Sequence, residues 1–178
     1  MATIIHTVNG ILSTGSRTTD RMGTRLAMLG HTVNDINQPI RSAWSARWKV
    51  NNDARDIIEQ VQDGDVIIAH SYGCLKTAIA MRNINFKAVF LFRPAMSRWH
   101  KFPAYQDTKI YCIYSPQDYT IWMGSLALYH PFGLAGARGF KNPYVKNVKS
   151  HGPHGHDFVS NNLEHWANFV DTTLKGLS

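Results

Sequence analysis

Short apolar runs alternate with segments of helical periodicity along this chain. Between the apolar runs, residues 20–30, 52–64 and 161–176 carry apolar side chains at the spacing of one helix face. The apolar runs have the length and the β-branched or aromatic content of strands, and they occupy residues 3–8, 31–36, 66–70, 88–92, 109–115 and 144–150. Strands that alternate with helices are typical of parallel strands joined by crossover helices. The pattern predicts an α/β fold with a mostly parallel sheet of about six strands and helices on both faces.

Two connections depart from this alternation. Residues 93–108 are irregular and aromatic, but they are too short to form a separate cap domain. Residues 119–143 begin as an amphipathic helix and end in a glycine-spaced loop. We expect that helix to pack on the sheet as an ordinary crossover, with Ile121, Leu126 and Tyr129 facing it; the alternative is a flap over a site. The sequence has no internal repeat, so we predict a single domain over residues 1–178.

The charge balance is basic, with 19 lysines and arginines against 12 acidic residues and a formal net charge of +7. These charges are scattered, and they accompany no recognised nucleic-acid motif. We therefore expect no nucleic-acid partner, although an anionic substrate or surface is compatible with the charge.

The hydropathy of the chain predicts no membrane span. No apolar run approaches the roughly 20 residues that cross a bilayer, and the first ten residues lack a basic leader followed by an apolar region. We expect a soluble, cytoplasmic protein.

Cys74 and Cys112 lie in segments predicted as a buried helix and a central strand, so we interpret them as packed thiols rather than a disulfide.

Ser71 lies where the apolar run 66–70 stops and a helical pattern starts. One interpretation is that this serine is the N-cap of the helix. The other is a nucleophile exposed by a sharp turn from strand to helix, which requires a strained backbone and small residues two positions before and after. Ala69 and Gly73 occupy those two positions.

The stretch Ala69-His70-Ser71-Tyr72-Gly73 resembles the nucleophile elbow of the α/β-hydrolases, Gly-x-Ser-x-Gly, with alanine in place of the first glycine. Small secreted bacterial lipases of about this chain length have the same form. The resemblance extends over nearly the whole chain, from Thr3 to Leu174. It implies a compact α/β-hydrolase domain.

The resemblance also implies a catalytic triad in the order serine, acid, histidine, each placed after a strand. Asp118 follows the apolar run 109–115 and is the candidate acid; alternatively, it is a turn aspartate that bonds its own backbone. Three histidines precede the last helix. We favour His156 as the base, since a glycine precedes it and Asp157 follows it, and His154 is the rival. His151 lies closer to the end of the last strand.

By the same resemblance, the backbone amides of Ile11 and Tyr72 are the candidate donors of an oxyanion hole. The family often has His-Gly in the first loop, where this chain has Asn9-Gly10. His70 is expected to pack under the turn rather than to react. The implied activity is that of a serine esterase, lipase-like or thioesterase-like, which needs no cofactor or metal and acts on a small-molecule or surface-borne ester.

Two other functions fit parts of the sequence. His151, His154, His156 and Asp157 crowd together as metal ligands can, but their spacing does not match a metallo-hydrolase pattern. The chain could also be a binding module that kept a hydrolase fold and lost the chemistry. Nothing at the candidate triad positions indicates such a loss.

Overall fold

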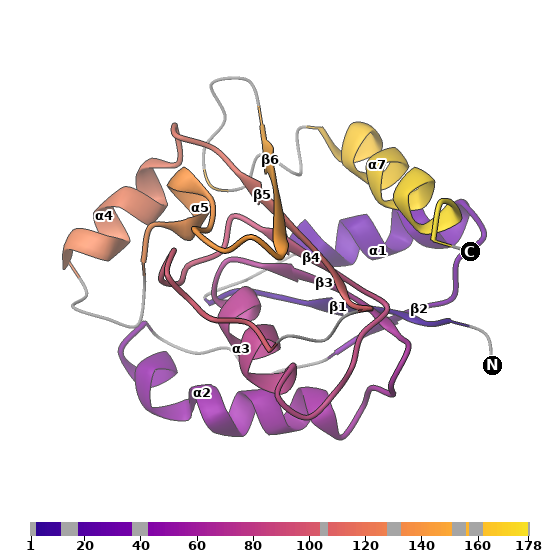
Figure 1. Cartoon of the computed structure of the whole chain (residues 1–178), viewed down its shortest axis with the longest axis horizontal. Helices are drawn as coiled ribbons and strands as arrows, with labels where there is room; N and C mark the ends of the chain where they lie inside the picture. The colour runs from indigo at the N-terminus through magenta and orange to yellow at the C-terminus, as the bar shows by residue number, and fades with distance from the viewer. Residues whose placement is uncertain are drawn as a thin grey trace.

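The computed structural model describes residues 3–11, 18–36, 43–103, 107–127, 133–150, 156 and 162–177. At its centre is a six-stranded sheet in which all neighbouring strands are parallel, in the order β2-β1-β3-β4-β5-β6 (Figure 1). The strands are β1 (Ile5–Val8), β2 (Val33–Asp35), β3 (Val66–His70), β4 (Ala88–Phe92), β5 (Lys109–Tyr114) and β6 (Val145–Lys149). The predicted α/β class and strand number are confirmed.

Helices cover both faces of this sheet, as the sequence pattern predicts (Figure 1). On one face α1 packs against α7, and on the other face α2 packs against α3. The helices are α1 (Thr18–Met28), α2 (Ala43–Ile58), α3 (Tyr72–Ala80), α4 (Tyr119–Ala127), α5 (Ala135–Arg138) and α7 (Leu163–Lys175).

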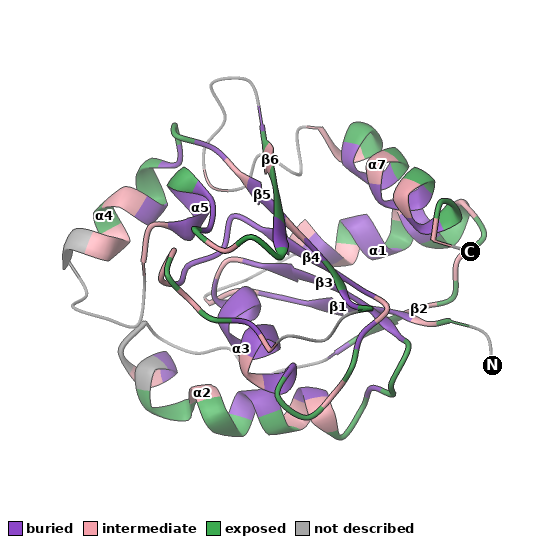
Figure 2. Cartoon of the chain, viewed as in Figure 1, coloured by how far each residue is buried: buried purple, intermediate pink, exposed green. Residues whose placement is uncertain are grey.

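The residues of the central strands are buried (Figure 2), and they contribute to two separate cores. In β3, Ile67 and Ala69 belong to the core under α2 and α3, whereas Val66 and Ile68 belong to the core under α1 and α7. All five residues of β3 and of β4 are buried. This burial explains why both strands are continuous apolar runs in the sequence, without polar alternation.

Helix α2 begins at Ala43, well before the predicted start at residue 52. The prediction took Asn52-Asp53 as the helix start, but Asn52 is exposed in the middle of the helix. The buried or half-buried positions Ala46, Val50, Ala54 and Ile57 follow helical spacing and pack in the core beside α3. Tertiary packing therefore extends the helix through residues that alone favour a start.

The chain after β5 differs from the expected crossover. Helix α5 packs on β5, and α4 packs on α5 beyond the carboxyl end of that strand (Figure 1). Ile121 is buried as expected, while Tyr119 and Met123 of the same helix are exposed. The side chain of Leu126 and all of Tyr129 lie outside the described residues.

Both cysteines are free thiols in the core, as expected from the sequence. Cys74 and Cys112 are buried and unpaired, and burial raises the pKa of both thiols. Within the described ranges, none of the helices combines the length and apolar character that crossing a bilayer requires.

The order of the strands reverses at β1. The chain first goes outward from β1 to β2, and it then crosses to β3 on the other side of β1. In open α/β sheets the carboxyl ends of the two strands at such a switch point form the usual ligand site. There the start of α3 lies against the end of β1: a Cβ on Gly73 would come within 2.6 Å of the Val8 carbonyl oxygen and 2.7 Å of the Asn9 carbonyl oxygen.

Gly73→Ala should therefore destabilise the fold, because both obstructing atoms are backbone and cannot rotate away. We expect a loss of about 2 kcal/mol or more in the free energy of unfolding, as for other overpacked sites. The matched control is Gly124→Ala in α4, where an added Cβ meets nothing within 4 Å and should stabilise the helix by up to about 1 kcal/mol. Urea denaturation followed by circular dichroism measures both. Equal effects of the two substitutions would contradict the close approach.

Candidate active site

Ser71 forms the turn between β3 and α3, and its backbone is strained. Its φ of 55° and ψ of −121° lie in a region that residues with a side chain rarely adopt. The turn is held by the Ser71 N–H, which donates to the Phe92 carbonyl at 2.9 Å, and by the Ser71 carbonyl, which accepts from the Ala95 N–H at 3.1 Å. Strain of this kind persists where the surroundings impose it, and it clusters at functional sites.

The capping interpretation of Ser71 finds no support in its contacts. The serine precedes the first residue of α3, as an N-cap does, but its side chain makes no capping hydrogen bond. The side chain is half-buried, so it is not enclosed in the core. The serine hydroxyl is therefore not used to begin the helix.

The loop after β1 passes directly beside Ser71. A Cβ on Gly10 would lie 3.0 Å from the Ser71 Cβ and 3.5 Å from its Oγ. Ile11 follows Gly10, and Tyr72 follows Ser71, so each candidate oxyanion donor is adjacent in the chain to a residue of this contact. Among the described residues, the Ile11 amide has no hydrogen-bond acceptor.

Asn9 anchors this loop to the first turn of α1. Its Nδ2 donates to Asp20 Oδ1 at 2.7 Å, and its Oδ1 accepts from the Thr19 hydroxyl. The asparagine that stands where the resembling family often has histidine is thus engaged with the helix rather than turned toward Ser71. Its contacts fix the backbone that leads to Gly10 and Ile11.

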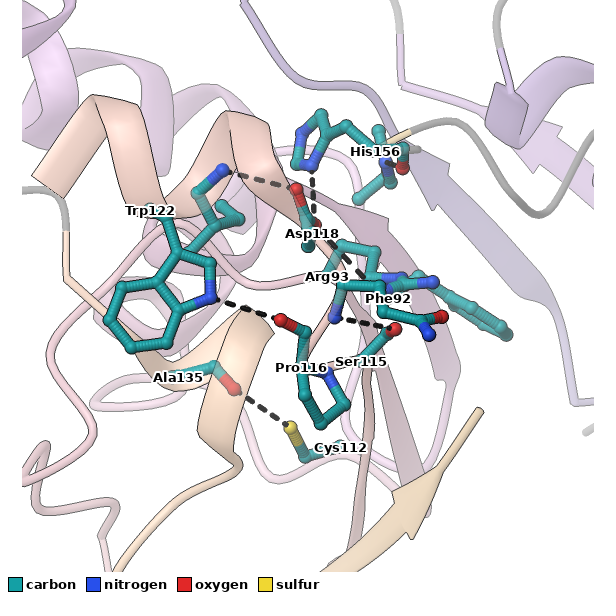
Figure 3. A network of polar contacts seen from close by, with 12 residues as sticks. Phe92, Arg93, Cys112, Ser115, Pro116, Asp118, Trp122, Ala135 and His156 are labelled. Atoms are coloured by element: carbon teal, nitrogen blue, oxygen red, sulfur yellow. Dashed lines mark hydrogen bonds and ion pairs between the residues drawn. The ribbon is translucent and has the colours of Figure 1, made fainter. Parts of the chain in front are cut away.

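Asp118 and His156 form a hydrogen-bonded pair (Figure 3). His156 Nδ1 lies 2.8 Å from Asp118 Oδ2, with the carboxylate side chain fully buried and the imidazole 18% exposed. The other carboxylate oxygen, Oδ1, accepts the Ile121 N–H at 3.0 Å in the first turn of α4. Asp118 therefore bonds its own turn, as the structural interpretation expects, and the same carboxylate also contacts His156, as a triad acid would.

His70 contacts the backbone of His156. Its Nε2 lies 3.2 Å from the His156 carbonyl oxygen, and the two rings are 4.7 Å apart between centroids. His70 is 8% exposed, which agrees with the expectation that it packs under the turn. Its link to the candidate base has no signal in the sequence.

Arg93 is the residue of this site that sequence analysis overlooked. It directly follows β4, its side chain is fully buried, and its Nη1 lies 4.0 Å from Asp118 Oδ2 (Figure 3). The signal in the sequence is a lone charge immediately after the apolar run 88–92. Burial lowers the pKa of Arg93 to about 10, against the opposing effect of the Asp118 carboxylate. The guanidinium therefore remains charged at neutral pH.

The remaining histidine candidates lie outside the described residues. His151, His154 and Asp157 belong to that part of the chain. The contact of His156 with Asp118 therefore cannot be compared with a contact of His154. Three of the four residues of the alternative metal cluster are also there. In the ranges that the structure does describe, no group of three or more His, Cys, Asp or Glu side chains is placed to hold a metal ion.

Comparison with known proteins identifies the architecture through structure rather than sequence. No protein-family model matches the chain, and no curated protein matches its sequence. Mouse α/β-hydrolase domain-containing protein 10 is 14% identical with a TM-score of 0.66, covering 98% of this chain and 90% of that protein. A pyrethroid hydrolase from Sphingobium faniae is 11% identical with a TM-score of 0.59, covering 97% of each chain.

A protein of the α/β-hydrolase superfamily from Xanthomonas campestris gives a similar result, with 15% identity, a TM-score of 0.57, and coverage of 97% of this chain and 99% of that one. The similarity thus spans whole chains, and at these identities it concerns the fold. Together with the parallel six-stranded sheet and its helical layers, these matches show that this chain has the α/β-hydrolase fold.

Proposed function

We propose that this protein is a serine hydrolase that cleaves a carboxylic ester or thioester through an acyl-enzyme. The observation that carries the proposal is the Asp118–His156 hydrogen bond of 2.8 Å. It lies at the carboxyl ends of the strands, where the strained Ser71 also lies. A hydroxyl is a weak nucleophile at neutral pH, so it requires a base, and the base requires an orienting carboxylate. The chain supplies these three groups in the family's order.

The proposed reaction assigns one role to each residue. Asp118 accepts the Nδ1–H of His156, which leaves Nε2 as the base. Nε2 takes the Ser71 proton as Oγ attacks the carbonyl carbon, and the amides of Ile11 and Tyr72 stabilise the resulting oxyanion. His156 then gives the proton to the departing alcohol or thiol. A water molecule, deprotonated by His156, then attacks the acyl-enzyme; His156 returns this proton to the departing Ser71 Oγ, and the carboxylic acid is released.

The fold supports this assignment, and the net charge is compatible with it. The fold is shared with proteins named as hydrolases, among them a pyrethroid hydrolase. The mechanism needs no metal or cofactor, and we propose a single domain without a cap. The net charge of +7 is compatible with an anionic or surface-borne ester. We propose such an ester, or another small-molecule ester, as the substrate, and we propose no nucleic-acid partner.

Ser71→Ala should reduce hydrolysis of p-nitrophenyl acetate by about three orders of magnitude or more, as loss of a triad member does in other serine hydrolases. A fluorophosphonate probe should label the unmodified protein, and peptide mapping should locate the label on Ser71. The control is Ser125→Ala, whose hydroxyl bonds the Trp122 carbonyl within α4. Near-normal turnover of Ser71→Ala would overturn the proposal.

Substitution of the candidate bases should give an asymmetric result. We expect His156→Ala to lose esterase activity and His154→Ala to keep most of it, because His156 contacts Asp118. In the unmodified protein, kcat/KM should rise with pH through a single ionisation, since the neutral imidazole is the active form. Steady-state kinetics from pH 5 to 9 test both points. An inactive His154→Ala beside an active His156→Ala would reverse the assignment.

The acyl pocket should be short. The connection after β4, where large lipases carry a cap, has only residues 93–108, and Phe102 within it is buried in the core. Each buried methylene adds about 0.8 kcal/mol, close to fourfold in kcat/KM, only while an apolar groove continues. We expect this gain to end within a few carbons across p-nitrophenyl esters from acetate to palmitate. A continued rise to palmitate, or a jump in rate where the ester aggregates, would contradict an open, capless site.

A further inference from the structure

The carboxylate that orients His156 also faces a buried cation. Arg93 Nη1 lies 4.0 Å from Asp118 Oδ2, and the same oxygen is 2.8 Å from His156 Nδ1. The side chains of Arg93 and Asp118 are both fully buried. The carboxylate therefore lies between a guanidinium that is charged at neutral pH and the imidazole that would become positive during the proposed reaction (Figure 3).

The backbone of Arg93 is held in place by two neighbouring elements, β5 and α5. Its φ is 50°, and in the described part of the chain the only other non-glycine residue with positive φ is Ser71. Its N–H donates to the Ile113 carbonyl of β5 at 2.9 Å. Helix α5 covers it so closely that a Cβ on Gly136 would lie 2.8 Å from the Arg93 carbonyl carbon. The position is strained for any side chain, so the surrounding structure must impose it.

Stability alone does not account for an arginine here. Burying a guanidinium and a carboxylate costs desolvation energy that their attraction often fails to recover, and apolar replacements of buried ion pairs are frequently neutral or stabilising. Burial indeed lowers the pKa of Arg93 to about 10, yet the group stays charged at neutral pH. The charge therefore requires an explanation in terms of what it faces.

The charge acts on the proposed base through Asp118. An unbalanced carboxylate at Nδ1 would strongly favour the protonated imidazole, which is the inactive form. A cation on the far side of the same carboxylate opposes that preference. In the described part of the chain, the charged or titratable groups facing His156 are Asp118, with Arg93 behind it, and His70, whose ring is 4.7 Å away.

We propose that Arg93 is a positioning residue whose buried charge balances Asp118 and thereby keeps His156 unprotonated, and so active, at lower pH than the Asp118–His156 pair alone would allow. This inference rests on the proposed serine hydrolase function. Arg93 touches neither the substrate nor the reacting atoms in this scheme; it acts through the carboxylate.

The test compares Arg93→Met, which keeps length and removes charge, with Arg93→Lys, which keeps charge. For p-nitrophenyl acetate, the midpoint of the rise of kcat/KM with pH should move up by about one pH unit in Arg93→Met and stay within about 0.3 units of the unmodified protein in Arg93→Lys. On the acidic side of the midpoint, Arg93→Met should be about tenfold slower. If Arg93 only filled space, its substitution would change the rate without moving the midpoint of the rise of kcat/KM with pH.

A second measurement does not depend on activity. In the Ser71→Ala background, NMR titration of the His156 imidazole, assigned by comparison with His156→Gln, should show the same upward shift on Arg93→Met. The shift should persist with His70→Asn, which removes the neighbouring ring as a titrating group.

Each outcome decides the proposal. An unmoved midpoint in a folded Arg93→Met overturns it. If Arg93→Met does not fold, Arg93→Gln must show the shift, and if neither uncharged variant folds while Arg93→Lys does, Arg93 is a structural residue and the proposal fails. Failure of the hydrolase function is distinguishable, because the unmodified protein would then hydrolyse no ester, or Ser71→Ala would keep the activity, while the NMR titration still reports on Arg93.

Discussion

The contact between the first turn of α3 and the end of β1 is the constraint on which the candidate site depends. Two backbone carbonyl oxygens, of Val8 and Asn9, lie where the Cβ of any residue other than glycine at position 73 would be. This contact lets the helix start immediately after β3, so the chain has to turn within the single residue Ser71. The same approach brings Gly10 against the serine side chain. One close backbone contact therefore accounts for the strain at Ser71 and for the nearby position of the first loop.

Asp118 shows how a residue can serve a local and a distant purpose together. Oδ1 accepts the Ile121 N–H and so fixes the carboxylate at the start of α4, whose helix dipole favours a negative charge there. Oδ2 is then left for His156, with Arg93 beyond it. Since the turn holds the carboxylate rigidly, the imidazole can be oriented by a single hydrogen bond. The turn and the site are thus not competing explanations of this residue.

The sequence predicts the sheet better than it predicts the helix boundaries or the surroundings of the site. Strands β3 and β4 have exactly the predicted bounds, 66–70 and 88–92, because burial on both faces makes them uninterrupted apolar runs. The start of α2 was missed because its polar residues Asn51 and Asn52 are on the solvent side, and only the packing against α3 shows the true extent.

The candidate site shows the same division between local and distant information. Ser71, Asp118 and His156 stand out because each occupies a position that the fold's chain order makes special. Arg93 stands out in the sequence only as a lone charge after an apolar run, and nothing there links it to Asp118 or His70 to His156, which lie 25 and 86 positions away. Contacts between residues so far apart in the chain form only in the folded state, so a single sequence does not show which residue each side chain faces.

Ser71 and Arg93 follow one structural rule at neighbouring strand ends. Each is the first residue after a central strand, and each donates its N–H to the next strand over, Ser71 to Phe92 and Arg93 to Ile113. The parallel ladder thus continues one residue past each strand before the chain leaves the sheet with positive φ. Because β3 and β4 are adjacent and in register, these two turns place two polar residues side by side at the carboxyl ends of the strands. The proposed nucleophile and the proposed charge partner of the acid therefore come from a repeated backbone arrangement, with the side chain at each turn deciding what that position can do.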